Sequence, residues 1–337
     1  MSFGPAGVGK TEMAIQACKD EGFEFVYLNL SVLEAPDLMG LPIIDESGDI
    51  KRSEYALPKM LPPRGSLAKP IVLLVDEADK AKPELQNPML ELFQFRSVNG
   101  TRLDVQAIIA TGNLPDENAF SQTMSHALMN RCGVFKVTHA FDPWRDWAVS
   151  AGVNPLIVGF LSTNPELLLK PPPAGDDTAY CHPTPRSWAL VGRDLDQCPD
   201  ESVDFHTLLV CGRVGQSAGV KFRVWLDHYR FVEPLVKALV SKGVKPDMAG
   251  PKATLDRIFV TAIASVEAIM RECRKGSSQV KVHEVTTNVM EWIKTLPGEI
   301  QIGALKSTLN MEVIRKYNLA RVPAFMEAYG EIHKIMK

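Results

Sequence analysis

A phosphate-binding loop motif at the start of the chain constrains its fold more than any other feature. Residues 4–11 read Gly-Pro-Ala-Gly-Val-Gly-Lys-Thr and fit the pattern G-x-x-x-x-G-K-[ST] at every fixed position. The glycines let successive backbone N–H groups point at phosphate oxygens, while Lys10 reaches the β- and γ-phosphates and Thr11 ligates Mg²⁺. The following residues, 11–20, predict a helix whose positive end faces the anion. An ordinary glycine-rich turn is the alternative for the motif taken alone.

The nucleotide contacts expected from this motif extend into the first turn of the helix. The residues expected to bind the nucleotide are Gly4, Pro5, Ala6, Gly7, Val8, Gly9, Lys10, Thr11 and Glu12.

Two acids end an apolar segment further along the chain. Residues 70–77 read Pro-Ile-Val-Leu-Leu-Val-Asp-Glu, and such a run is typical of a strand buried on both faces of a parallel sheet. Open α/β sheets bind ligands at the carboxyl ends of their strands. We therefore expect Asp76 to hold Mg²⁺, directly or through a water, and Glu77 to orient or deprotonate the attacking water. Two solvated acids capping the next helix are the alternative.

Other apolar segments predict the rest of an α/β sheet. Residues 23–30 alternate and are rich in aromatics, and residues 105–111 and 134–137 are further strand-like runs. Asn113 follows the second of these strands, so its amide lies at the same sheet edge and can hydrogen-bond the γ-phosphate or the water. A simple turn residue is the other interpretation of Asn113.

Turn signals predict two hairpins outside this sheet. Asn99-Gly100 lies between short extended segments, which is typical of a tight hairpin. Residues 45–52 contain Gly48 among polar residues and predict a hairpin or a plain surface loop. Pro83 suits the first turn of a helix over residues 83–95, but Pro88 should kink or restart it.

After Asp142 the strand-like runs end and helical periodicity takes over. A proline-rich break at 170–177 precedes Thr184, which can cap a helix whose first residue is Pro185. Arg186 then lies in the first turn, where the helix dipole disfavours a cation. An anionic partner for Arg186 is expected, with a surface salt bridge as the alternative.

Composition narrows the class of protein. With 337 residues, 45% of them hydrophobic and 23% charged, the chain has room for two or three soluble domains. A net charge of −3 gives no general affinity for nucleic acid or membranes, and no apolar run is long enough to cross a bilayer. The six cysteines are scattered without a C-x-x-C pair, which indicates reduced thiols in a cytoplasmic protein and argues against a zinc site.

With these residues in place, the chain resembles the AAA+ ATPases, specifically the MoxR-like branch with its dynein-related type of ATPase domain. The segments that carry the resemblance are residues 4–11, 37–40, 75–79, 110–113, 130–131 and 183–188. The resemblance covers nearly the whole chain, and its nucleotide motifs are the most specific part. It implies a P-loop αβα sandwich over residues 1–142, a helical lid over 143–245 and a helical C-terminal extension over 246–337.

The resemblance also implies roles for two arginines and for partners. Arg131 resembles an arginine finger that reaches the ATP of a neighbouring subunit, and Arg186 resembles a lid sensor of the γ-phosphate. A finger supplied in trans makes hydrolysis depend on assembly. The family implies ATP and Mg²⁺ as ligands and a ring, usually hexameric, that remodels a partner. A protein with a von Willebrand factor A-type domain is the partner that this branch implies.

The start of the sequence departs from the family. Only Met1-Ser2-Phe3 precede the loop, whereas the family has a central strand there. Without that strand its two neighbours would keep unpaired edges, which is costly when buried. The N-terminal strand is expected to be missing here. Because lacking it is costly, we expect the chain to be a shortened version of a longer protein.

Three functions follow from these patterns. The leading interpretation is an ATP-hydrolysing remodelling motor in which Lys10, Glu77, Asn113, Arg131 and Arg186 act on the phosphates and the water. A non-hydrolysing nucleotide-binding scaffold is the second interpretation, because the missing strand could cost catalysis. A nucleic-acid motor is the third, but the helical half has no dense Lys/Arg stripe with interleaved aromatics.

Overall fold

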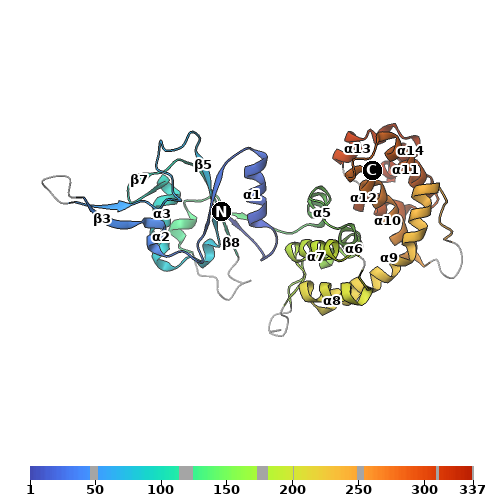
Figure 1. Cartoon of the computed structure of the whole chain (residues 1–337), viewed down its shortest axis with the longest axis horizontal. Coiled ribbons are helices and arrows are strands. Elements are labelled where there is room, and N and C mark those ends of the chain that lie inside the picture. The colour runs from blue at the N-terminus through green and yellow to red at the C-terminus, as the bar shows by residue number, and fades with distance from the viewer. Residues whose placement is uncertain are drawn as a thin grey trace. The chain divides into compact units, whose positions relative to one another are not determined.

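The computed structural model describes residues 1–45, 52–113, 124–172, 181–199, 201–248, 254–308 and 311–335. Contacts divide the chain into two compact units, Met1–Thr138 and His139–Lys337 (Figure 1). The first unit holds the sheet, and the second is built from helices.

A five-stranded parallel sheet forms the centre of the first unit. Across the sheet the strands are β2 (Phe25–Asn29), β5 (Ile71–Asp76), β8 (Val105–Gly112), β1 (Ser2–Phe3) and β9 (Phe135–Lys136). The strands predicted from residues 23–30, 70–77, 105–111 and 134–137 are thereby confirmed, as is the α/β fold class.

The strand predicted to be missing is present, so that prediction is wrong. Ser2 and Phe3 form β1, which pairs with β8 on one side and with β9 on the other. The backbone of Val137 donates a hydrogen bond to the carbonyl of Phe3 at 2.7 Å, and the Phe3 side chain is buried. Its two residues pair with the last two residues of β8, Thr111 and Gly112, and with both residues of β9, so the ends of these strands are joined through β1. A segment this short carries no periodicity that sequence analysis could recognise.

Helices cover both faces of the sheet, as Figure 1 shows. Alternate residues of β5 face opposite helices, because successive side chains of a strand point to opposite faces. Val72 and Leu74 pack against α1 (Lys10–Asp20). Ile71, Leu73 and Val75 share a core with the buried side chains of α3 (Pro83–Phe95). The β5 run is therefore buried on both sides, as its composition predicted.

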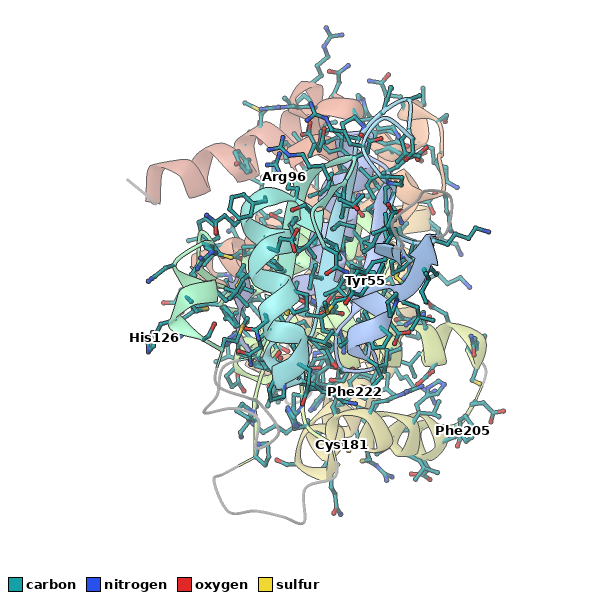
Figure 2. All side chains as sticks on the ribbon, turned by 90° about the vertical axis from the view of Figure 1, so that its left-hand side faces the viewer. Tyr55, Arg96, His126, Cys181, Phe205 and Phe222 are labelled. Atoms are coloured by element: carbon teal, nitrogen blue, oxygen red, sulfur yellow. The ribbon has the colours of Figure 1, made fainter. Side chains whose placement is uncertain are left out.

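α3 runs from Pro83 to Phe95 without a break at Pro88, so the predicted restart does not occur. Proline removes the hydrogen bond to the carbonyl four residues earlier. That carbonyl belongs to Glu84 in the exposed first turn, where water can satisfy it. Arg96, labelled in Figure 2, then ends the helix with a left-handed backbone conformation at φ 53°.

Both predicted hairpins are present. β6 (Ser97–Val98) and β7 (Thr101–Arg102) are joined by Asn99 and Gly100, whose positive φ angles of 47° and 76° suit a two-residue turn. The Glu91 carboxylate fixes this hairpin to α3 by accepting hydrogen bonds from Ser97 Oγ and from the backbone of Asn99 and Gly100. β3 (Leu41–Asp45) and β4 (Arg52–Ala56) pair antiparallel after α2 (Ala35–Met39). The predicted turn at Gly48 lies outside the described residues.

The second unit contains helices throughout its described residues. They are α5 (Phe141–Ser150), α6 (Pro155–Thr163), η3 (Pro165–Leu167), α7 (Pro185–Gln197), α8 (Val203–Val214), α9 (Gln216–Lys242), α10 (Leu255–Arg274), α11 (Gln279–Ile293), α12 (Gly298–Thr308), α13 (Met311–Lys316), η4 (Leu319–Arg321) and α14 (Pro323–Ile335). In the part of the chain that the structure describes, every helix is too short or too polar to cross a bilayer.

Two large apolar cores lie in this unit, besides a small cluster of Val236, Ala264 and Ala268. One includes Phe160, Trp188 and Phe222, and the other lies among α10, α11, α12 and α14. The long helices α9 and α10 contribute buried residues to both cores. The division into a lid over 143–245 and an extension over 246–337 stays a prediction. Part of the proline-rich break, residues 173–177, lies outside the described residues.

A buried carboxylate near the end of α10 gives a stability prediction. Hydrogen bonds from Ser277 and the nearby Lys281 and Lys275 outweigh burial and lower the pKa of Glu272 from 4.5 to about 2. A lowered folded-state pKa adds stability above pH 4.5 that is lost as the pH falls toward 2. We expect Glu272→Gln to lower the free energy of unfolding by about 1–2 kcal/mol at pH 7, since the lysines are solvent-exposed.

Urea unfolding at pH 7 and pH 3 measures this effect. The gap between wild type and Glu272→Gln should shrink at pH 3, and an equal gap at both values would contradict the assignment. Glu284→Gln on the exposed face of α11 is the matched control.

Candidate nucleotide site

The phosphate loop connects β1 to α1 and depends on its glycines. A side chain at Gly4 would collide with the backbone carbonyl of Val137. Gly7 and Gly9 have φ angles of 74° and 98°, in the left-handed region that favours glycine. Gly9 is the N-cap residue of α1 and contributes no side-chain acceptor to the first turn. The loop therefore brings the positive end of α1 to the carboxyl end of the sheet, as the motif predicted.

Lys10 begins α1 and its ammonium group contacts three acceptors. Nζ donates to the backbone carbonyls of Gly4 and Pro5, each at 2.8 Å, and to Oδ1 of Asn113 at 3.0 Å. The two carbonyls hold the side chain across its own loop. The amide of Asn113 connects it to the end of β8.

Asp76 at the end of β5 accepts hydrogen bonds from four donors. Oδ1 accepts from the hydroxyl of Thr11 at 3.0 Å, from the hydroxyl of Thr111 and from the backbone N–H of Glu77. Oδ2 accepts from the hydroxyl of Tyr27 at 2.8 Å. Burial raises the pKa of Asp76, but these hydrogen bonds outweigh burial and hold it below its ordinary value. The carboxylate is therefore ionised and oriented toward the phosphate loop.

Glu77 follows directly, with its backbone in the left-handed region at φ 53°. A non-glycine residue in this region is uncommon and turns the chain sharply, which separates the side chains of Asp76 and Glu77. The Glu77 carboxylate is half-buried and pairs with Nζ of Lys80 at 3.0 Å. This ion pair holds Glu77 at the start of η1 (Ala78–Lys80).

Asn113 lies just beyond β8, where the sequence placed it. Its side chain accepts from Lys10, and its backbone N–H donates to Oδ1 of Asp79 at 3.0 Å. The structure thus brings Lys10 into contact with Asn113 and its neighbour Thr11 into contact with Asp76.

The two predicted arginines belong to different units of the chain, Arg131 to the first and Arg186 to the second. Arg131 is exposed after α4 (His126–Met129), and its guanidinium donates to Oε1 of Gln94 and to the carbonyl of Ala127, each at 2.7 Å. Arg186 is exposed in the first turn of α7, which Thr184 caps as predicted by accepting from the backbone of Ser187 at 3.0 Å. Arg186 belongs to the second unit, and its role toward a nucleotide stays a prediction.

Four side chains at the site were missed by sequence reasoning. They are Tyr27, Asp79, Lys80 and Thr111. Asp79 and Thr111 lie within motif segments. Because each is a polar residue next to a predicted strand end, sequence analysis could have identified both as candidate site residues. Tyr27 lies in the middle of β2, and only the register of β2 against β5 brings its hydroxyl to Asp76.

The donor set fits a magnesium ion. Mg²⁺ prefers hard oxygen ligands and is usually held by one or two carboxylates together with substrate phosphates. The Thr11 hydroxyl and the Asp76 carboxylate are such ligands, and they are adjacent at 3.0 Å. Among the described residues, no group of three or more His, Cys, Asp and Glu side chains is gathered in one place.

Fold and site together define a P-loop nucleotide-binding protein. Residues 1–136 match the sequence profile of the family described as "ATPase family associated with various cellular activities (AAA)". This part of the chain is therefore similar to AAA-family ATPase domains, a class that hydrolyses ATP at its phosphate loop.

Solved structures that are similar to the chain include those of NtrX and RuvB. NtrX from Brucella abortus, solved in complex with ADP, has 15% sequence identity and a TM-score of 0.37, and the match covers 98% of this chain. The chain spans 64% of the length of that NtrX chain. A RuvB mutant from Thermotoga maritima has 11% identity and a TM-score of 0.33, with 73% of this chain and 72% of that chain covered. Comparison with curated protein sequences gives no match.

Proposed function

We propose that this chain is a MoxR-like AAA+ ATPase that hydrolyses ATP with Mg²⁺ to remodel or activate a partner protein. The observation that carries the proposal is a pair of hydrogen bonds from adjacent residues of the phosphate loop, Lys10 to Asn113 at the end of β8 and Thr11 to Asp76 at the end of β5. These groups supply the cation, the metal ligands and the polar amide that phosphoryl transfer requires at one place.

Each residue has one task in this proposal. Lys10 and the amides of the loop bind the phosphates, and Thr11 and Asp76 hold Mg²⁺, which neutralises phosphate charge when bound. Glu77 orients the attacking water and accepts its proton. Asn113 binds the γ-phosphate or the water. Arg131 and Arg186 stabilise γ-phosphate charge, the first in a neighbouring subunit and the second in its own.

The presence of β1 weakens the competing proposal of a non-hydrolysing scaffold. That proposal depended on a missing central strand, and Ser2 and Phe3 occupy its position between β8 and β9. The loop therefore follows a strand that is paired on both sides.

Partner and assembly are the finer part of the proposal. We propose a ring, hexameric as is usual for this branch, and a protein with a von Willebrand factor A-type domain as its partner. The support for both is the resemblance of the motifs, together with the exposure of Arg131 on the surface of the first unit. An exposed arginine can reach a neighbouring subunit without moving the sheet.

Mixing two inactive variants tests whether Arg131 acts in trans. Arg131→Ala keeps an intact nucleotide site but lacks the finger, whereas Lys10→Ala keeps the finger but lacks the site. Each alone should turn over ATP at least about 10³-fold more slowly than wild type. Their mixture should regain turnover, because some sites of the first variant then face an intact Arg131. The measurement is steady-state ATP hydrolysis at rising protein concentration.

A mixture that stays as inactive as its components would contradict a trans-acting Arg131. Arg64→Ala, which removes another exposed arginine of the same unit, is the matched control and should keep wild-type turnover.

A further inference from the structure

Asp79 is a buried carboxylate at the candidate site with no task in the function proposed above. Its residue is 1% exposed, within the short η1 helix. Oδ1 accepts the backbone N–H of Asn113 at 3.0 Å, while Oδ2 is buried and accepts from none of the described residues. Burying a carboxylate oxygen without a donor costs free energy. Packing alone would be served better by an apolar side chain, so the retained carboxylate indicates a function for the bond to Asn113.

The end of β8 is shaped to accept this carboxylate. A Cβ atom at Gly112 would lie 3.0 Å from Oδ1 of Asp79 and 2.7 Å from Cε1 of Phe3. Gly112 therefore allows Asp79 and the β1 side chain to approach the strand end closely. As a result, the N–H of the next residue, Asn113, can reach the carboxylate.

The bond to Asp79 fixes the residue that contacts Lys10. Asn113 is held by its backbone N–H on Asp79 and by its side-chain oxygen on Lys10 Nζ. The hydrogen bond to Asp79 sets the position from which the Asn113 side chain extends. Lys10 has two further acceptors within its own loop, Gly4 and Pro5, and these do not depend on Asn113.

We propose that Asp79 is a positioning residue that holds Asn113 in place for ATP hydrolysis. The inference rests on the proposed function, because it assigns Asp79 a task in the same site. Without the Asp79 carboxylate, the Asn113 amide loses its anchor and samples positions away from the γ-phosphate and the water. Nucleotide binding remains, since Lys10, Thr11 and the loop keep their other contacts.

Substitutions at Asp79 separate positioning from packing. Asp79→Ala and Asp79→Leu both remove the acceptor, and leucine also fills the space. Misplacement of a catalytic group commonly costs up to about 10²-fold in rate, so we expect both variants to lower kcat by about 10- to 100-fold. The dissociation constant of a fluorescent ATP analogue with Mg²⁺ should change less than about threefold. Asp79→Asn keeps an acceptor oxygen and should restore kcat to within about threefold of wild type.

A double-mutant cycle with Asn113 decides whether Asp79 acts through it. Asp79→Ala should lower kcat in the wild-type chain but cause no further loss in Asn113→Ala. Independent, multiplying losses in the two backgrounds would overturn the proposal. So would an equal loss of nucleotide affinity and kcat together with a lower unfolding temperature in Asp79→Leu, because a packing role has that signature.

Amide hydrogen exchange at Asn113 provides a measurement that does not need turnover. Exchange measured by NMR on the full chain should be slow in wild type and Asp79→Asn, and at least about tenfold faster in Asp79→Leu. If wild type hydrolyses no ATP, the proposed function fails, while the exchange rates still decide whether Asp79 anchors Asn113. Equal exchange in all three chains would refute the anchoring.

Discussion

Replacing Glu77 with Gln is expected to lower ATP turnover by about 10²- to 10⁴-fold while leaving nucleotide affinity within about threefold of wild type. Gln keeps the shape of the side chain and can still accept a hydrogen bond, but it cannot accept the proton of the attacking water. The groups that bind phosphate and metal, Lys10, Thr11 and Asp76, are untouched by the change.

Stability should barely change in this variant. Glu77 pairs with Lys80 at 3.0 Å, and both side chains are partly exposed, so the ion pair contributes at most about 1 kcal/mol. The measurement is steady-state hydrolysis of ATP with Mg²⁺, together with titration of a fluorescent ATP analogue. Glu84→Gln, an exposed acid in the first turn of α3, is the matched control and should keep full turnover. Unchanged turnover in Glu77→Gln would rule out the role given to this residue.

Much of the sheet could be predicted because the burial of each long strand leaves a recognisable pattern of apolar residues in its own sequence. The β5 segment is apolar from Ile71 to Val75, since α1 covers one face and α3 the other. The β6–β7 hairpin could be predicted because Asn99 and Gly100 both tolerate the positive φ that a two-residue turn requires. In these cases the local chemistry of a few adjacent residues determines the structure.

β1 and the unbroken course of α3 through Pro88 could not be predicted in this way. Ser2 and Phe3 become a strand only because β8 and β9 each pair with them, and those strands lie far away in the sequence. Pro88 disfavours a helix interior on local grounds, but it is buried in the core beneath the sheet with Leu85, Met89 and Leu92 as buried neighbours on the same helix. Tertiary packing therefore overrides the local preference at both places.

The residues of the candidate site also fall into two groups, those that local sequence motifs reveal and those that only tertiary contacts reveal. Lys10, Thr11, Asp76 and Glu77 belong to motifs whose spacing within one segment reveals their chemistry. Tyr27 and Thr111 donate to Asp76 from other strands, so strand register decides their contacts. Asp79 accepts from the backbone of Asn113, and the turn after β5 decides that contact. Sequence motifs thus predict the groups that touch a ligand better than the groups that hold those residues in place.

Lys10→Ala is expected to weaken binding of ATP with Mg²⁺ by about 100-fold or more. Hydrogen bonds to charged groups contribute about 1.5–3 kcal/mol each, and each 1.4 kcal/mol is a tenfold change in affinity. The ammonium of Lys10 is the cation that the loop holds beside Asn113, and the next residue, Thr11, donates to Asp76. Its removal also leaves the carbonyls of Gly4 and Pro5 without this donor, so the loop loses an internal tie.

The loss of affinity for ATP expected for Lys10→Ala is not explained by the loss of one positive charge alone. A second lysine on the same helix tests whether the position of the charge matters. Lys19→Ala removes one positive charge from the exposed last turn of α1, so it changes the net charge of the protein equally. It should leave the affinity for ATP within about twofold, because an exposed charge at the far end of the helix is screened by salt. The measurement is titration of a fluorescent ATP analogue with each variant at physiological ionic strength. Equal affinities for Lys10→Ala and Lys19→Ala would mean that the nucleotide does not occupy this loop. They would contradict the proposal that Lys10 and Asp76 bind the same complex of ATP and Mg²⁺.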